Sequence, residues 1–367
     1  MTHRMLPSWA IIRFAAIVAL AFVALPAVDM RLAFAADADT SSIAKSSRYQ
    51  ADTLQLKPLS DMSPADDYHG CKGGLYPDAR NERPAAHESA GIQLASDIHP
   101  LDADGKLATD GKIVLLGIGF SNTLQCFKGF IDVAAEAKGL NPHVVLVNGA
   151  HGGRSAFMIE SLDNPVGSDY WKSWVPSHLK DAGVTAAQVQ AVWLKETDAQ
   201  LGPGQLKMMG IDKYDCAMNH PFPDDARMLQ AELGQIVRII HGQFPNAKMV
   251  YLSSRSYGGW AQRGNTEPFS YDTGYAVKWL IEQQIQGSAE LNFDPAKGEV
   301  KAPWLSWGPY LWANAEERRQ DGFANLFEDY RSNDHLHHSD QGIKKMGMLL
   351  LEFFQKDSST RGWFNTP

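Results

Sequence analysis

The chain has little cysteine: its 367 residues include only Cys71, Cys126 and Cys216. Three thiols are too few for a scaffold built on disulfides, which small secreted domains use in place of a large core. The sequence leaves open one disulfide with a free thiol, or three reduced and buried thiols. In either case a core of apolar side chains must stabilise the fold.

Basic residues are outnumbered, with 34 Lys and Arg against 42 Asp and Glu and a net charge of −8. A chain this acidic lacks the basic surface that binds nucleic acid or anionic lipid, so neither is expected as a partner. After residue 28 no apolar run is long enough to span a membrane, and no internal repeat is visible.

The N-terminus has the pattern of an export signal. Arg4 and Arg13 flank the start of a nearly continuous apolar stretch at residues 14–28, and Ala33, Phe34 and Ala35 fit a small-residue cleavage site. The apolar run is shorter than the roughly 20 residues of a spanning helix. We therefore expect residues 1–35 to be a cleaved signal peptide and the protein to be periplasmic or secreted. Losing three Arg and one Asp would shift the net charge from −8 to −10.

The mature chain is predicted to form one large domain with less regular segments before it. Residues 36–66 are rich in Ala, Asp, Ser and Thr, which is typical of a flexible leader. Residues 67–110 begin with a stretch dense in Gly, Pro and Asn and are expected to be irregular and packed on the domain. The domain itself is assigned to residues 111–360, which are enough for a sizeable core.

Within that domain short apolar runs alternate with helical patterns. Strands are predicted at residues 113–117, 144–147, 189–194, 249–252 and 304–307, and helices at 127–138, 224–244 and 275–286. This alternation predicts an α/β fold, with a central parallel sheet covered by helices on both faces. In such sheets ligands bind at the carboxyl ends of the strands.

Polar residues with catalytic chemistry follow the predicted strands. Ser121 comes after the first strand, and Asp334 precedes His337 by three residues on a loop that enters a helix. An Asp at this spacing can hold one imidazole nitrogen while the other takes a proton from a serine. We therefore predict Ser121 as nucleophile, His337 as base and Asp334 as the residue that orients the base. A serine in this place, taken alone, is more often a helix N-cap than a nucleophile.

These motifs resemble, in the same order, those of the SGNH/GDSL hydrolase superfamily over roughly residues 111–355. The family's nucleophile block matches Gly119 to Ser121, with Phe120 where the family has Asp. Its glycine turn resembles residues 148–153, and its Asp-x-x-His block resembles residues 334–337. The resemblance implies a three-layer α/β/α flavodoxin-like fold and esterase or lipase activity without a metal or other cofactor. It also implies an oxyanion hole containing the amides of Ser121 and Gly152.

The third block of the family departs from its pattern here. Where the family has an Asn that donates to the oxyanion, this chain has Glu196, Thr197 and Asp198, and a one-residue shift decides whether Thr197 or Asp198 takes that place. A Thr hydroxyl can donate, whereas an ionised Asp would repel the oxyanion. Losing one such donor costs about 3–4 kcal/mol of transition-state stabilisation. A nearby cation such as Arg255 could replace the donor instead, or the protein is a weak or unusual hydrolase.

Other polar and aromatic residues are candidates for substrate binding. Asn122, Arg255 and Tyr257 follow strands and are predicted to line the pocket, although Asn122 could instead support its turn and Arg255 could pair with a surface carboxylate. Four aromatic residues near the fifth strand form either a sugar-stacking platform or part of the core: Trp304, Trp307, Tyr310 and Trp312.

The loop at residues 334–340 also allows a metal site, because it contains three His and two Asp residues. Adjacent residues on a short loop rarely point at one centre, so the catalytic interpretation is preferred. His335 and His338 are then expected at the loop surface or at the rim of the substrate site.

Taken together, the sequence predicts an exported serine hydrolase that removes a short acyl group, such as acetyl, from a carbohydrate or another extracellular ester. One alternative is a non-catalytic glycan-binding protein of the same fold. The other is a metal-dependent hydrolase that uses the 334–340 loop.

Overall fold

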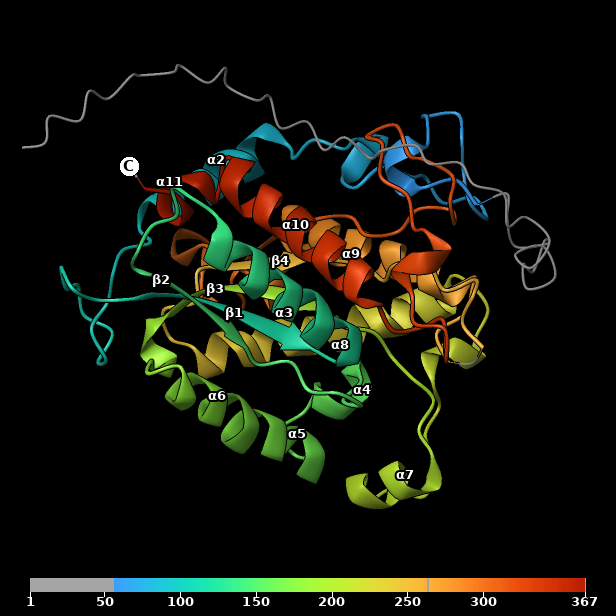
Figure 1. Cartoon of the computed structure of the whole chain (residues 1–367), viewed down its shortest axis with the longest axis horizontal. Coiled ribbons are helices and arrows are strands. Elements are labelled where there is room, and N and C mark those ends of the chain that lie inside the picture. Colours follow the sequence, from blue (N-terminus) through green and yellow to red (C-terminus); the bar gives the residue numbers. More distant parts are fainter. Residues whose placement is uncertain (1–55, 263, 367) are drawn as a thin grey trace, which may run out of the picture. The chain divides into compact units, whose positions relative to one another are not determined.

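The computed structural model describes residues 56–262 and 264–366, so the predicted signal peptide and residues 36–55 of the predicted leader lie outside the described residues. Its centre is a five-stranded parallel sheet in the order β2-β1-β3-β4-β5 (Figure 1). This is the strand order of flavodoxin-like sheets, and it confirms the predicted three-layer fold class. The strands are β1 Ile113–Gly119, β2 Val144–Asn148, β3 Val189–Lys195, β4 Met249–Leu252 and β5 Trp304–Trp307.

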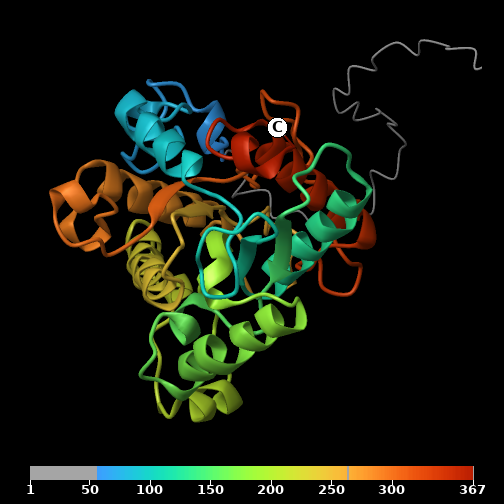
Figure 2. The ribbon, with the colours of Figure 1, turned by 90° about the vertical axis from the view of Figure 1, so that its left-hand side faces the viewer.

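One face of the sheet is covered by α3 (Ser121–Glu136) and α10 (Asp340–Lys356), with α11 (Arg361–Phe364) beside them (Figures 1 and 2). Phe127 of α3 stacks on Trp193 of β3, and Phe130 stacks on Phe354 of α10, with ring centres 6.0 and 5.4 Å apart. Each such buried side chain stabilises the fold by roughly 1.5–3 kcal/mol. These aromatic residues hold α3 and α10 together over the sheet.

The opposite face is covered by α8 (Asp224–Gln243) and α9 (Phe269–Ile285) and by the short helices α4 (Ala156–Ile159), α5 (Pro165–Asp169) and α6 (Val175–Asp181). Val114, Val192 and Val250, one from each central strand, are fully buried in this layer. Successive strand residues point to opposite faces, which explains why the central strands are apolar throughout.

Two further helices complete the fold. α2 (Ala85–Ser96) precedes β1, and α7 (Pro203–Met209) lies in the long excursion between β3 and α8 (Figure 1). α2 packs beside α11 on the α3 and α10 side of the sheet, where Gly91 lies against the ring of Trp304. Single helical turns occupy several connections: Leu59–Asp61, Pro77–Ala79, Tyr170–Trp174, Ala186–Gln188, Ala217–Asn219, Ala289–Leu291, Pro295–Lys297 and Phe327–Asp329.

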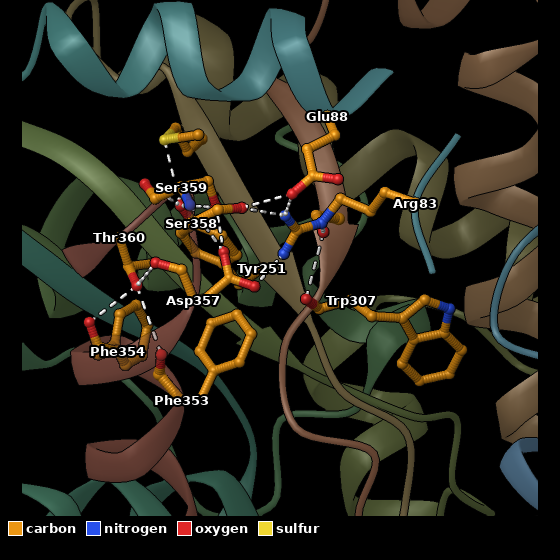
Figure 3. A network of polar contacts seen from close by, with 12 residues as sticks. Arg83, Glu88, Tyr251, Trp307, Phe353, Phe354, Asp357, Ser358, Ser359 and Thr360 are labelled. Atoms are coloured by element: carbon orange, nitrogen blue, oxygen red, sulfur yellow. Dashed lines mark hydrogen bonds and ion pairs between the residues drawn. The ribbon is translucent and has the colours of Figure 1, made fainter. Parts of the chain in front are cut away.

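The segment before α2 packs against the edge strand β5. Arg83 donates from Nε to Ser306 Oγ (2.8 Å) and pairs with Asp357, and Figure 3 shows its guanidinium directed at the turn that carries Asp357 and Ser358. His87 Nε2 contacts Leu305 O at 2.8 Å, so a side chain covers an edge that would otherwise be open to another strand. Within the predicted leader, Leu59 is fully buried.

The structure settles the alternatives for cysteine and for the aromatic residues. Cys71, Cys126 and Cys216 are free thiols, the last two buried and Cys71 half-buried. The four aromatic residues considered as a platform are all in the core, so the platform interpretation is wrong: Trp304, Trp307, Tyr310 and Trp312. No helix of the described residues is long and apolar enough to cross a membrane.

Candidate active site

The candidate site lies at the carboxyl ends of β1 and β3, where the strand order of the sheet reverses. Gly119 ends β1 with φ +146°, and a Cβ on it would lie 2.1 Å from Lys195 O, so only glycine fits beside β3 there. Phe120 is the N-cap of α3, and Ser121 is the first residue of the helix. The N-cap interpretation of Ser121 is therefore wrong, and its hydroxyl is available for another contact.

Ser121, His337 and Asp334 lie together, although 216 residues separate the serine from the histidine. His337 Nε2 is 2.9 Å from Ser121 Oγ, and His337 Nδ1 is 2.7 Å from Asp334 Oδ2. Asp334 Oδ1 also accepts from the amides of Leu336 (2.9 Å) and His337 (3.0 Å). The partial burial of the Asp334 carboxylate raises its pKa, but the hydrogen bonds from His337 and Leu336 outweigh this and lower the pKa below its usual value.

The hydrogen-bond partners of His337 determine which of its two ring nitrogens carries the proton. An ionised Asp334 can only accept hydrogen bonds, so Nδ1 must carry the ring proton and donate to Oδ2. Nε2 is then an acceptor for the Ser121 hydroxyl at 2.9 Å. This arrangement prepares the serine to lose its proton to the imidazole.

The glycine turn after β2 lies next to Ser121. The amide of His151 donates to Gly119 O at 2.9 Å, which ties the turn to the end of β1. A Cβ built on Gly152 would be 3.9 Å from Ser121 Cβ, so the two residues are neighbours. Gly153 has φ +73°, a conformation that favours glycine. The amide of Ser121 lies in the first turn of α3, where backbone amides have no partner within the helix.

The sequence left open whether Thr197 or Asp198, both after β3, has the side chain expected to donate to the oxyanion. Asp198 accepts from the amides of Ala199 and Ala217, each at 2.8 Å, and from the Tyr214 hydroxyl. Burial raises its pKa to about 6, and its carboxylate is committed to these contacts. The alternative in which Asp198 serves the oxyanion is therefore wrong. Thr197 is fully buried, and its hydroxyl has no hydrogen-bond partner among the described residues.

Two buried cations, Arg255 and Lys195, lie against the ring of Phe120, the residue before Ser121. Arg255 Cζ is 5.3 Å and Lys195 Nζ is 5.7 Å from the ring centre, distances at which an aromatic face attracts cations. Burial lowers the pKa of Lys195 to about 8 and that of Arg255 to about 10. This contact gives a physical reason for an aromatic residue at position 120.

The three residues predicted to line the substrate pocket are buried instead. Asn122, Arg255 and Tyr257 are each at most 1% exposed. Arg255 donates from Nη1 to Asn122 Oδ1 at 2.7 Å, and Asn122 Nδ2 donates to Leu336 O at 3.0 Å. Their burial contradicts the prediction that they face substrate. Asn122 and Arg255 bind each other beneath Leu336. Tyr257 packs against Trp260 and Trp312.

His335 and His338 are not at the rim either. His335 stacks on Phe327 with ring centres 4.5 Å apart, and His338 is fully buried with Nε2 3.5 Å from Ser256 Oγ. Burial holds the pKa of His338 well below its usual value. Among the described residues no group of three or more His, Cys, Asp or Glu side chains is placed to hold a metal ion.

Sequence reasoning missed two groups of residues around this site. Gln125, one helical turn after Ser121, binds the backbone of His338, and its i, i+4 spacing from the serine was a usable signal. Glu160, which is half-buried, and Glu232 join Glu196 and Asp198 in a cluster of carboxyls. No local pattern marks that cluster, because its members come from distant parts of the chain.

No protein-family model and no curated protein sequence matches this chain. Solved structures that match include a GDSL-like lipase from Parabacteroides merdae, with 12% identity, 69% of this chain and 96% of that chain covered and a TM-score of 0.33. A carbohydrate esterase matches with 11% identity, 69% and 68% coverage and a TM-score of 0.32. An extracellular lipase from Streptomyces rimosus matches with 12% identity, 65% and 98% coverage and a TM-score of 0.30. Values this low say nothing about the activity of this chain.

Proposed function

We propose that this protein is a serine ester hydrolase with Ser121 as nucleophile, His337 as general base and acid, and Asp334 as the residue that orients His337. The observation that carries the proposal is the pair of hydrogen bonds through one imidazole, 2.9 Å to Ser121 Oγ and 2.7 Å to Asp334 Oδ2. A serine is a poor nucleophile without an adjacent base, and this pair supplies one.

The reaction would proceed through an acyl-enzyme. Ser121 Oγ attacks the ester carbonyl carbon while His337 Nε2 takes the hydroxyl proton, and the carbonyl oxygen becomes an oxyanion. The carbon–oxygen bond to the alcohol then breaks, and His337 returns its proton to the departing alkoxide. Water attacks the acyl-serine with His337 again as base, which releases the acid and restores Ser121.

Backbone amides would stabilise the oxyanion. The amides of Ser121 and Gly152 are the proposed donors, and the positive end of the α3 dipole adds to their effect. Thr197 would contribute a third donor only after a rearrangement, because its hydroxyl is buried. An ester is the proposed substrate because its alkoxide leaves more easily than the amine of an amide.

We further propose that the protein is exported and acts on a short acyl ester of an extracellular carbohydrate or a similar alcohol. The export pattern at residues 1–35 supports the compartment. The partly exposed Ser121 and His337 place the reacting atoms at the surface, where a glycan chain can reach them.

Ser121→Ala tests the proposal. We expect the wild type to hydrolyse p-nitrophenyl acetate and acetylated sugars and to be labelled by a fluorophosphonate, with activity in the exported fraction of the host. Ser121→Ala should lose at least about a thousandfold in kcat and all labelling. Ser173→Ala, which removes an exposed hydroxyl in the connection to α6, is the matched control and should behave as the wild type. Equal turnover by Ser121→Ala and the wild type would exclude Ser121 as nucleophile.

A non-catalytic glycan-binding protein of the same fold is the second candidate, favoured by the burial of the Thr197 hydroxyl, the side-chain donor that the sequence offered for the oxyanion. Measurable glycan binding without labelling of Ser121 would support that candidate and exclude the hydrolase.

A further inference from the structure

The backbone on both sides of His337 is bound by side chains of α3, the helix that carries Ser121. Asn122 Nδ2 donates to the carbonyl of Leu336 at 3.0 Å. Gln125 contacts His338 twice, donating to its carbonyl at 3.2 Å and accepting from its amide at 3.1 Å. Three hydrogen bonds therefore connect the nucleophile's helix to the residues that flank the base.

The orientation of the Asn122 amide is determined by its partners. Arg255 Nη1 lies 2.7 Å from Oδ1, and a guanidinium can only donate, so this atom must be the carbonyl oxygen. The NH2 group is then the one that faces Leu336 O. Because Asn122 and Gln125 are both buried, water competes little for these hydrogen bonds.

The loop that they bind needs external contacts to keep its shape. His335 has φ +48°, a left-handed conformation that is unfavourable for a residue other than glycine. Such a conformation persists where surrounding contacts impose it. Ser121 and Gln125 are four residues apart on one face of a rigid helix, so a contact to His338 also sets the distance of His337 from Ser121.

We propose that Asn122 and Gln125 are positioning residues, which hold His337 Nε2 within hydrogen-bonding distance of Ser121 Oγ without touching the substrate. The proposal rests on the serine hydrolase function above. Helix α3 then carries the nucleophile and also fixes the position of the base. The buried Arg255 fixes the orientation of the Asn122 amide.

Two variants separate positioning from ordinary structural support. Asn122→Asp keeps an acceptor for Arg255 and adds a negative charge that pairs with the guanidinium, and it replaces the donation to Leu336 O by a repulsive contact between two oxygens. Gln125→Met keeps the length of the side chain and removes both contacts to His338. Gln188→Met is the matched control: Gln188 is also buried, donates to Leu101 O at 2.7 Å and accepts from Thr185 N at 3.0 Å, at the other end of β3.

We expect Asn122→Asp and Gln125→Met to lower kcat about ten- to hundredfold, because small displacements of a base reduce its efficiency steeply. KM should change by less than about twofold, since no substrate contact is removed. Gln188→Met should lose a similar amount of thermal stability and keep the wild-type kcat. In crystal structures of the two site variants the distance from Ser121 Oγ to His337 Nε2 should exceed the 2.9 Å of the wild type.

An unchanged distance in both variants, together with a kcat within about twofold of the wild type, would overturn the inference and leave the hydrolase function standing. A wild type that neither turns over esters nor reacts with a fluorophosphonate would instead refute the proposed function. The crystallographic distance still decides the positioning role in that case, because it does not depend on activity.

Discussion

Lys195 is a cation that the fold buries without a hydrogen-bond partner among the described residues. Its burial, aided by the charge of Arg255 and opposed by the nearby Cys126 and Glu196, lowers its pKa from 10.5 to about 8. The ring of Phe120 offsets part of the desolvation. At pH 7 the folded state therefore holds a charge that the unfolded state would solvate better.

Lys195→Met should stabilise the protein at neutral pH by roughly 1–3 kcal/mol, because it removes a buried charge and keeps a similar volume. The unfolded state binds more protons at this residue between pH 8 and 10.5, so wild-type stability should rise across that window and the advantage of the variant should shrink. Urea unfolding at pH 7 and pH 10 measures both effects. Lys106→Met, at an exposed lysine, should change little. A less stable Lys195→Met at pH 7 would contradict the argument.

The residues of the proposed triad could be predicted because their signals are local. Ser121 follows a strand, and Asp334 and His337 keep a spacing with a direct chemical meaning. Arg255 was placed at the correct strand end but was expected to face substrate. Its partner Asn122 is 133 residues away, and nothing in the local sequence indicates that a loop covers both.

At the scale of elements, the crossing of α3 and α10 sets the position of the loop that carries His337. A Cβ on Gly347 of α10 would lie 2.3 Å from the carbonyl carbon of Gly129, and a Cβ on Gly129 would lie 2.1 Å from Ile343 O. The two helices thus touch backbone to backbone. Because α10 begins at Asp340, directly after the loop, this crossing also limits where His337 can lie.

Gly347→Ala should therefore destabilise the protein by about 1–3 kcal/mol, because the added methyl group meets backbone that cannot move aside. It should also lower the proposed esterase activity by shifting α10 and the loop before it. Gly242→Ala in α8 is the matched control, since a Cβ there has no neighbour within 4 Å and alanine favours a helix. Thermal unfolding of the two variants compares them. A Gly347→Ala variant as stable as Gly242→Ala would show that the helices can separate without cost.

Strands were easier to predict than helix starts. The predicted ranges 249–252 and 304–307 match β4 and β5, because short apolar runs in a parallel sheet have clear ends. α3 begins at Ser121 rather than 127, and α9 at Phe269 rather than 275. The first turns of both helices contain polar residues that are buried, so the apolar periodicity that marks a surface helix is absent there.

At the scale of the whole molecule, the side-chain carboxyl groups of four acidic residues from three parts of the chain lie close together. Glu160 follows α4, Glu196 and Asp198 follow β3, and Glu232 is on α8. Burial raises the pKa of Glu160 to about 7, with the charge of Asp198 adding to it. Burial and the neighbouring carboxyls also raise the pKa of Glu232 well above its usual value.

A raised carboxyl pKa makes stability fall as pH rises. Between the ordinary value of 4.5 and the folded value of about 7, Glu160 keeps its proton in the folded state and loses it on unfolding. The contribution of the cluster to the free energy of unfolding is therefore complete below about pH 4.5. It is lost as the pH rises through the pKa values of the folded state. Asp334 acts in the opposite direction: its pKa is lowered, so its contribution is lost as pH falls below its ordinary value of 3.8.

We therefore expect thermal stability to be highest in mildly acidic buffer and to decline toward pH 8. Glu232→Gln keeps the shape of the buried side chain without its charge, so it should raise the melting temperature at pH 8 more than at pH 5. Glu299→Gln, at an exposed position, should leave the pH dependence unchanged. Calorimetric melting of the three proteins at pH 5 and pH 8 makes the comparison. A Glu232→Gln variant with the same decline as the wild type would mean that Glu232 is not part of the coupled cluster.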